Sequence, residues 1–99
     1  MIKHIVMWKL NNDNDKETAL AEARQKLLSL RNSLPAELLS SIEVGINSDK
    51  GTGSHDIVLI TEHNNWEALQ GYQNHPEHLK IAAYVKENLS QRSCVDFEY

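Results

Sequence analysis

Residues 2–10 of the 99-residue chain read IKHIVMWKL, and the spacing of their apolar side chains predicts the architecture. Successive side chains of a strand point to opposite faces of a sheet, so this stretch presents two surfaces. One surface carries Ile2, His4, Val6, Trp8 and Leu10. The other carries Lys3, Ile5, Met7 and Lys9. Because apolar residues occur on both, the pattern predicts a strand in a sheet that is covered on its two faces.

The rest of the chain alternates between helical and strand periodicity. An amphipathic helix is predicted where apolar residues recur at three- and four-residue spacing, at Leu20, Ala23, Leu27, Leu30 and Leu34. Asn14 or Asp15 can cap this helix, and Pro35 ends it. Strands are predicted at 42–46, 56–62 and 93–99, with a helical region broken at Pro76 before the last of them. The inward side chains of that helical region are predicted to be Trp66, Leu69, Tyr72, Leu79, Ala82, Val85 and Leu89.

The predicted order of elements is β-α-β-β-α-β, which is typical of a ferredoxin-like α+β fold. We expect residues 1–99 to form one domain, an antiparallel sheet with both helices on one face. The other face would remain apolar on the first and third strands, and large exposed apolar patches are rare on soluble monomers. A homodimer joined sheet to sheet, burying roughly 600 to 1,000 Å² per subunit, is therefore expected.

Composition narrows the classes of function. The net charge is −4 and the ten Lys and Arg residues are scattered, so no nucleic-acid partner is expected. No apolar run approaches the roughly 20 residues that span a bilayer, and the start of the chain alternates like a strand. We therefore expect no membrane partner and a cytoplasmic location. Cys94 is the only cysteine, which excludes an intrachain disulfide and predicts a buried structural thiol.

Reactive side chains gather in the segment 72–80, YQNHPEHLK, which we call the helix joint. Pro76 fits the first turn of a new helix, so Tyr72 would close one helix and His78 would lie at the start of the next. The positive end of a helix dipole favours a neutral imidazole there. Such an imidazole can take a proton from the carbon next to a carbonyl, while a phenol donates to the carbonyl oxygen. A structural role for both side chains is the alternative.

The same segment also contains metal-ligand types, in His75, Glu77 and His78. The two histidines are three residues apart, His75 is better placed as a helix cap, and no third and fourth ligands are evident. We therefore expect no metal, and the proton transfer described above requires no cofactor.

Several short motifs carry a family resemblance over nearly the whole chain. They are IKHIV at 2–6, WKL at 8–10, EVG at 43–45, DIVLI at 56–60, YQNHPEH at 72–78 and VDF at 95–97. Together they resemble the stress-responsive A/B barrel (Dabb) family. The resemblance implies a ferredoxin-like fold paired into a dimeric α+β barrel. Most members have no assigned reaction, but plant members similar to olivetolic acid cyclase perform a cofactor-free, aldol-type cyclisation of a linear polyketide.

The resemblance also implies roles for individual residues. In the cyclase-like members a tyrosine and a histidine act together, and they match Tyr72 and His78; a first-strand histidine matches His4. The third-strand histidine of those members is replaced by Asp56, which could orient His4 or His78 or simply face water at the strand end. The expected contacts to a ligand are Trp8, Asp56, Val58 and His75. We expect Val58 on the same sheet face as His4, and the bulk of Trp8 could fill part of a cavity there.

Three functions compete at this point. The first is a cofactor-free enzyme or binding protein for a small apolar or carbonyl-bearing molecule. The second is a non-catalytic stress-response dimer in which the helix joint serves packing. The third, by analogy of fold alone, is a haem-degrading or quinol monooxygenase. A cavity of roughly 300 Å³ or more lined by His4, Tyr72 and His78 would favour the first function, and a solidly packed interior would favour the second.

Overall fold

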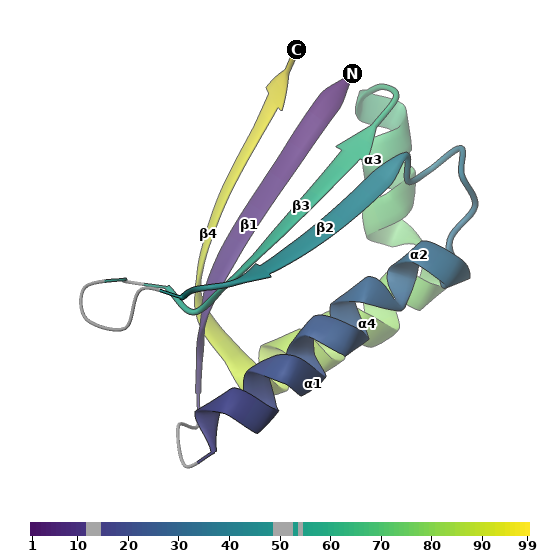
Figure 1. The fold of residues 1–99 in the computed structure, drawn as a ribbon. Coiled ribbons are helices and arrows are strands. Elements are labelled where there is room, and N and C mark those ends of the chain that lie inside the picture. The colour runs from purple at the N-terminus through teal and green to yellow at the C-terminus, as the bar shows by residue number, and fades with distance from the viewer. Residues whose placement is uncertain (12–14, 49–52, 54) are drawn as a thin grey trace.

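The computed structural model describes residues 1–11, 15–48, 53 and 55–99. Its sheet has the antiparallel strand order β2-β3-β1-β4. The strands are β1 (Ile2–Leu10), β2 (Ser41–Ile46), β3 (Ile57–His63) and β4 (Leu89–Glu98). β1 pairs antiparallel with the edge strand β4, so the start of the first strand lies beside the end of the last. The two ends of the chain are therefore close together (Figure 1).

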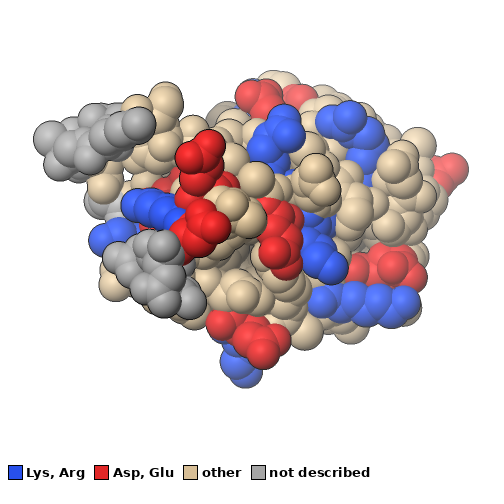
Figure 2. Space-filling model, turned by 60° about the horizontal axis from the view of Figure 1, so that its bottom comes forward, with Lys and Arg blue, Asp and Glu red and all other residues tan. Residues whose placement is uncertain are grey.

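The helices all cover one face of this sheet, as the ferredoxin-like prediction requires (Figure 1). They are α1 (Lys16–Leu28), α2 (Leu30–Ser33), α3 (Trp66–Asn74) and α4 (Pro76–Asn88). No helix in the described ranges is long and apolar enough to cross a membrane. On the face in Figure 2, basic and acidic side chains are intermixed without a basic stripe.

The first predicted helix is present but interrupted. The C-cap of α1 is Ser29, whose hydroxyl donates to the carbonyl of Lys26 (2.6 Å). The backbone N–H of Asn32 then donates to the carbonyl of Ser29 (3.2 Å), a tighter turn than that of an α-helix. Its apolar stripe is nevertheless buried throughout, at Leu20, Ala23, Leu27, Leu30 and Leu34. Asp15 caps α1 by accepting from the backbone N–H of Thr18, whereas Asn14 lies outside the described residues.

The second helical region breaks at Pro76 as predicted. His75 has an extended backbone (ψ 139°) and Pro76 occupies the first turn of α4, where its missing N–H costs nothing. Two of the predicted inward residues were wrong: Leu79 is 55% exposed and Trp66 is 48% exposed. α4 carries apolar residues on more than one side, so its periodicity alone could not say which side faces the sheet.

The final strand contains a bulge that interrupts the alternation of its side chains. Met7 pairs with Ser93 and Lys9 pairs with Ser90, so Gln91 and Arg92 together lie opposite the single residue Trp8. Gln91 has φ 55°, a left-handed conformation that is uncommon for a residue other than glycine. Because of this extra residue, Leu89 and Arg92 lie on the same face of the sheet although they are three positions apart.

The sheet face away from the helices, here called the outer face, is apolar. Its strands present Ile5, Met7, Val58, Ile60, Val95 and Phe97. The first four are half-buried by their neighbours in the same chain, while Val95 is 59% and Phe97 is 40% exposed. In the part of β4 after the bulge, the apolar side chains Val95 and Phe97 point away from the helices, and the more polar side chains Cys94 and Asp96 point toward them.

Candidate functional site

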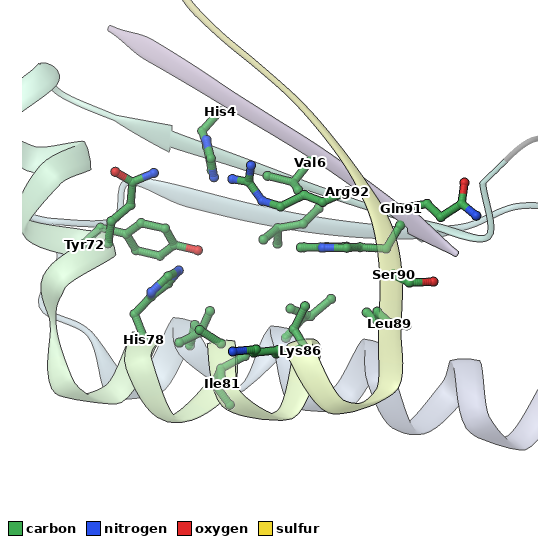
Figure 3. A pocket seen from close by; sticks show the side chains of 17 residues that line it. His4, Val6, Tyr72, His78, Ile81, Lys86, Leu89, Ser90, Gln91 and Arg92 are labelled. Carbon is green, nitrogen blue, oxygen red and sulfur yellow. The ribbon is translucent and has the colours of Figure 1, made fainter. Parts of the chain in front are cut away.

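A pocket of about 340 Å³ lies between the sheet and the helices (Figure 3). Its walls are mainly apolar and include Val6, Leu27, Leu30, Leu59, Ile81 and Val85. Trp8 also lines the pocket from β1, and the cavity remains open beside it. A volume of this size suits a small organic ligand, and His4, Tyr72 and His78 all reach the same space.

The helix joint brings Tyr72 and His78 together. Tyr72 lies near the end of α3 and is fully buried, while His78 lies in the first turn of α4. Their ring centroids are 4.6 Å apart, and both side chains point into the pocket (Figure 3). Among the described residues, neither Tyr72 Oη nor His78 Nδ1 has a hydrogen-bond partner. Buried polar groups are nearly always paired, so two unpaired polar atoms beside one pocket are an exception that calls for a partner.

Both groups keep their neutral forms near pH 7. Burial raises the pKa of the Tyr72 phenol well above its ordinary value, and the Thr61 hydroxyl opposes this only in part. Burial likewise lowers the pKa of His78, although the carbonyl of Gln73 acts in the opposite direction. A phenol that keeps its proton is a donor, and a neutral imidazole offers a lone pair.

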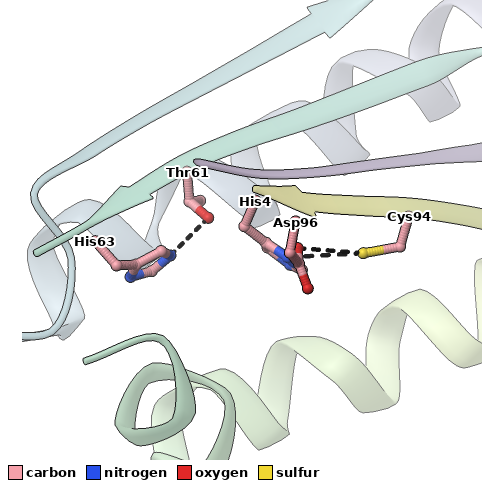
Figure 4. Close-up of polar contacts among 5 residues, drawn as sticks. All are labelled: His4, Thr61, His63, Cys94 and Asp96. Atoms are coloured by element: carbon pink, nitrogen blue, oxygen red, sulfur yellow. Dashed lines mark hydrogen bonds and ion pairs between the residues drawn. The ribbon is translucent and has the colours of Figure 1, made fainter. Parts of the chain in front are cut away.

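His4 reaches the pocket from β1 and is held by an acidic partner. Its Nδ1–H donates to the carboxylate of Asp96, the residue directly opposite it on β4 (Figure 4). With the proton on Nδ1, the lone pair of the neutral imidazole is on Nε2. The bond to Asp96 also fixes the orientation of the His4 ring. The His4 ring lies 6.3 Å from the Tyr72 ring, centroid to centroid. The pocket therefore contains a second imidazole with a defined tautomer.

A further buried histidine, His63, was not singled out from the sequence. Its Nδ1–H donates to the carbonyl of Leu38 (2.6 Å), and its Nε2 accepts from the Thr61 hydroxyl (2.8 Å; Figure 4). The centroid of the His63 ring lies 4.8 Å from that of the Tyr72 ring, so the two side chains pack against each other. The signal was available: the alternation of Ile57 and Leu59 reaches His63 if the strand is extended one residue past the predicted end.

The structure places three of the predicted ligand contacts outside this pocket. Val58 pairs with Met7, and directly opposed residues share a face, so Val58 lies on the outer face and Leu59 lines the pocket instead. Asp56 accepts from the backbone N–H of Leu10 (2.8 Å) and pairs with Lys16 (2.8 Å), at the strand end and away from the histidines.

The third, His75, is not among the residues that line the pocket. Its Nδ1 accepts from the backbone N–H of Glu77 (3.1 Å), which makes it the cap of α4. Glu77 in turn accepts from Lys80 (3.1 Å). The trio of His75, Glu77 and His78 therefore does not converge on one point.

A different group of metal-ligand types does converge, at His4, Cys94 and Asp96. One donor atom from each lies within 4.8 Å of the others. Hydrogen bonds account for this arrangement, because His4 and the Cys94 thiol both donate to Asp96. Burial and the Asp96 charge raise the pKa of Cys94, which keeps the free thiol protonated. Cys94 is half-buried, less than the sequence predicted.

The two buried histidines next to Tyr72 make a prediction about stability. The pKa values of His63 and His78 are lowered from 6.5, mainly by burial, so the unfolded chain binds protons at a higher pH than the folded one. The free energy of unfolding should therefore fall as the pH drops below about 6.5. Urea titrations of the wild type and His78→Gln between pH 8 and 5 check this. We expect a shallower decline in the variant, and an identical decline would contradict the assignment.

Comparison with known proteins was made on sequence and on structure. The sequence model of one family, described as "Stress responsive A/B Barrel Domain", matches residues 2–99. No curated protein sequence gives a significant match. A solved structure from Bacteroides fragilis, a dimeric protein of unknown function with a ferredoxin-like fold, is 33% identical. It superposes with a TM-score of 0.79 over 99% of this chain and 95% of that one.

Two further structures have the same fold at lower identity. A dimeric ferredoxin-like protein of unknown function from Thermobifida fusca is 22% identical, with a TM-score of 0.82 over 99% of this chain and 90% of that one. A Dabb family protein with a ferredoxin-like fold from Mesorhizobium loti is 17% identical, with a TM-score of 0.68 over 99% and 95% of the two chains.

Proposed function

Because the chain belongs to the stress-responsive A/B barrel (Dabb) family, we propose that it forms a homodimer and that each pocket binds a small carbonyl compound and activates it by acid–base catalysis. The observation that carries this proposal is the pair of unpartnered buried atoms, Tyr72 Oη and His78 Nδ1, beside a cavity whose walls are mainly apolar. A carbonyl oxygen can accept from the phenol, and a hydrogen on the neighbouring carbon would then face the imidazole.

The chemistry follows from the protonation states. Neutral His78 takes a proton from the carbon next to the carbonyl, and the electron pair of the C–H bond moves onto the carbonyl oxygen. The Tyr72 hydroxyl stabilises that oxygen by donating a hydrogen bond, and its raised pKa prevents it from losing its own proton. The enolate then either recovers the proton from His78 or attacks a second carbonyl carbon of the same molecule. The second course is an aldol-type ring closure, in which the oxygen of the attacked carbonyl becomes an alkoxide and takes the proton back from His78.

His4 is proposed to orient the ligand. With Nδ1–H bound to Asp96, its Nε2 lone pair can accept from an enol or hydroxyl group on the ligand. The His63 ring packs against Tyr72, and neither His63 nor Thr61 is among the residues that line the pocket, so we assign both as positioning residues. No step in this scheme requires a metal or an organic cofactor.

The homodimer is supported by the outer face. The helices cover only one side of the sheet, and the outer face presents Ile5, Met7, Val58 and Ile60 in a continuous central patch on β1 and β3. A second copy that places its own outer face there would remove both patches from water. The similar Bacteroides and Thermobifida proteins are described as dimeric.

Hydrogen exchange into a simple ketone tests the proposed chemistry. 2-Octanone offers an apolar body and exchangeable hydrogens on the carbons beside its carbonyl. In D₂O at pH 7, we expect the wild type to accelerate deuterium uptake at those carbons, followed by proton NMR. His78→Ala should lose the acceleration, whereas Leu79→Ala, an exposed position one residue along α4, should keep it. A protein that binds the ketone but gives only the background rate would instead favour the non-catalytic stress-response dimer.

A further inference from the structure

The pocket carries positive charge on an acidic protein. Arg92 and Lys86 line it together with the apolar walls, and none of the described lining residues is an aspartate or glutamate. The whole chain has a net charge of −4, and both signs are mixed on the face in Figure 2. The excess of cations is therefore a local property of the cavity.

The bulge in β4 places Arg92 in the pocket. Cys94, opposite Val6, faces the helices, so Arg92 two residues earlier shares that face. Regular alternation would then turn Ser90 inward, but the extra residue at Gln91 brings Leu89 inward instead. Figure 3 shows Arg92 extending toward His4, while Gln91 and Ser90 point the other way. The left-handed Gln91 backbone is a strain of the kind found where a chain aims a functional side chain.

Arg92 lies close to the reactive groups and lacks a carboxylate partner. Arg92 is exposed at the wall of the pocket, and its charge lowers the pKa values of both His78 and Cys94. Within the described ranges, the ion pairs of the chain join His4 to Asp96, Lys16 to Asp56 and Lys80 to Glu77, and none includes Arg92 or Lys86. A guanidinium beside apolar walls is suited to bind a carboxylate through two parallel hydrogen bonds.

We propose that the pocket selects an amphipathic acid, a molecule with an apolar body whose carboxylate binds Arg92, with Lys86 adding a second positive charge at the rim. This inference rests on the proposed function and names the class of its ligand: the carbonyl lies at Tyr72 and His78, the apolar body lies along Val6, Leu59 and Val85, and the acid lies at Arg92. A neutral ketone lacks the third contact and binds more weakly.

A matched pair of probes tests this selection. Octanoate and 1-octanol share an apolar body and differ in the charge of the head group, and their affinities can be measured by isothermal titration calorimetry at low salt. We expect the wild type to bind octanoate about tenfold more tightly than octanol, because a charge-assisted hydrogen bond contributes at least that factor. Arg92→Gln should remove the preference by weakening octanoate binding about tenfold while octanol binding stays the same. Lys80→Gln removes a charge on the exposed side of α4 and is the matched control.

The outcomes separate this inference from the proposed function. If Arg92→Gln binds octanoate as tightly as the wild type, or if the wild type binds both probes equally, the pocket accepts apolar molecules but does not select acids. If neither probe binds the wild type, the pocket is not a ligand site, and the proposed function fails together with the selection of an acid. Circular dichroism of Arg92→Gln shows whether the sheet persists. Arg92→Lys should retain part of the preference for octanoate, because it keeps the positive charge but lacks the planar guanidinium that donates two parallel hydrogen bonds.

Discussion

Tyr72→Phe should give a protein that is more stable than the wild type and nearly inactive. The Tyr72 hydroxyl is buried without a hydrogen-bond partner among the described residues, and an unpaired buried polar group costs about 1 to 3 kcal/mol. Removing it should raise the free energy of unfolding by about 1 kcal/mol, as measured by urea denaturation. The same change removes the donor to the developing oxyanion, so deuterium uptake into 2-octanone should fall about a hundredfold.

Lower stability with unchanged exchange activity in Tyr72→Phe would instead show that the Tyr72 hydroxyl has a structural role. In that case the phenol serves packing and the helix joint is not a catalytic site. Tyr84→Phe is the matched control, since Tyr84 also lies on the helical side but is not among the residues that line the pocket. We expect the exchange rate of that variant to equal the rate of the wild type.

Ile60→Lys should convert the proposed dimer into a monomer. Ile60 lies in the middle of β3 on the outer face, opposite Ile5 and Glu43 on its two neighbouring strands. In a sheet-to-sheet dimer the substitution would take an ammonium out of water in each copy, with only the exposed Glu43 beside it, and burying a charge costs several kcal/mol. Size-exclusion chromatography with light scattering measures the result, and circular dichroism shows whether the monomer keeps its fold.

Leu79→Lys is the control for added charge. Leu79 is an apolar residue of similar size, but it is 55% exposed on α4 and lies away from the outer face. This variant should have the mass of the wild type in solution. A dimer of unchanged affinity in Ile60→Lys would place the subunit interface elsewhere on the molecule.

The fold could be predicted because its signals are local. The alternation in residues 2–10, the leucine stripe of the first helix and the break at Pro76 each depend on neighbours within one element. The same holds for Tyr72 and His78, which a single proline positions at the end of one helix and the start of the next. The alternation places His4 on an otherwise apolar strand face, and only the family resemblance made it a candidate site residue.

The parts that could not be predicted depend on the pairing of distant segments. Asp96 meets His4 across strands that are 92 residues apart, and only their register shows which carboxylate is the partner. The same register error assigned Val58 to the pocket, since the two faces of β3 are about equally apolar and a shift of one residue exchanges them. Arg92 was missed because a bulge breaks the alternation on which strand predictions rely.

Stereochemistry at the exchanging carbon tests the central proposal most directly. The third carbon of 2-octanone carries two hydrogens that free solvent base removes equally, whereas one imidazole in a fixed pocket reaches only one of them. We expect wild-type protein to replace one of these two hydrogens by deuterium at least about tenfold faster than the other, with a rate that saturates as ketone is added. Equal exchange of both hydrogens, at a rate that His78→Ala and Tyr72→Phe share with the wild type, would contradict acid–base catalysis in this pocket.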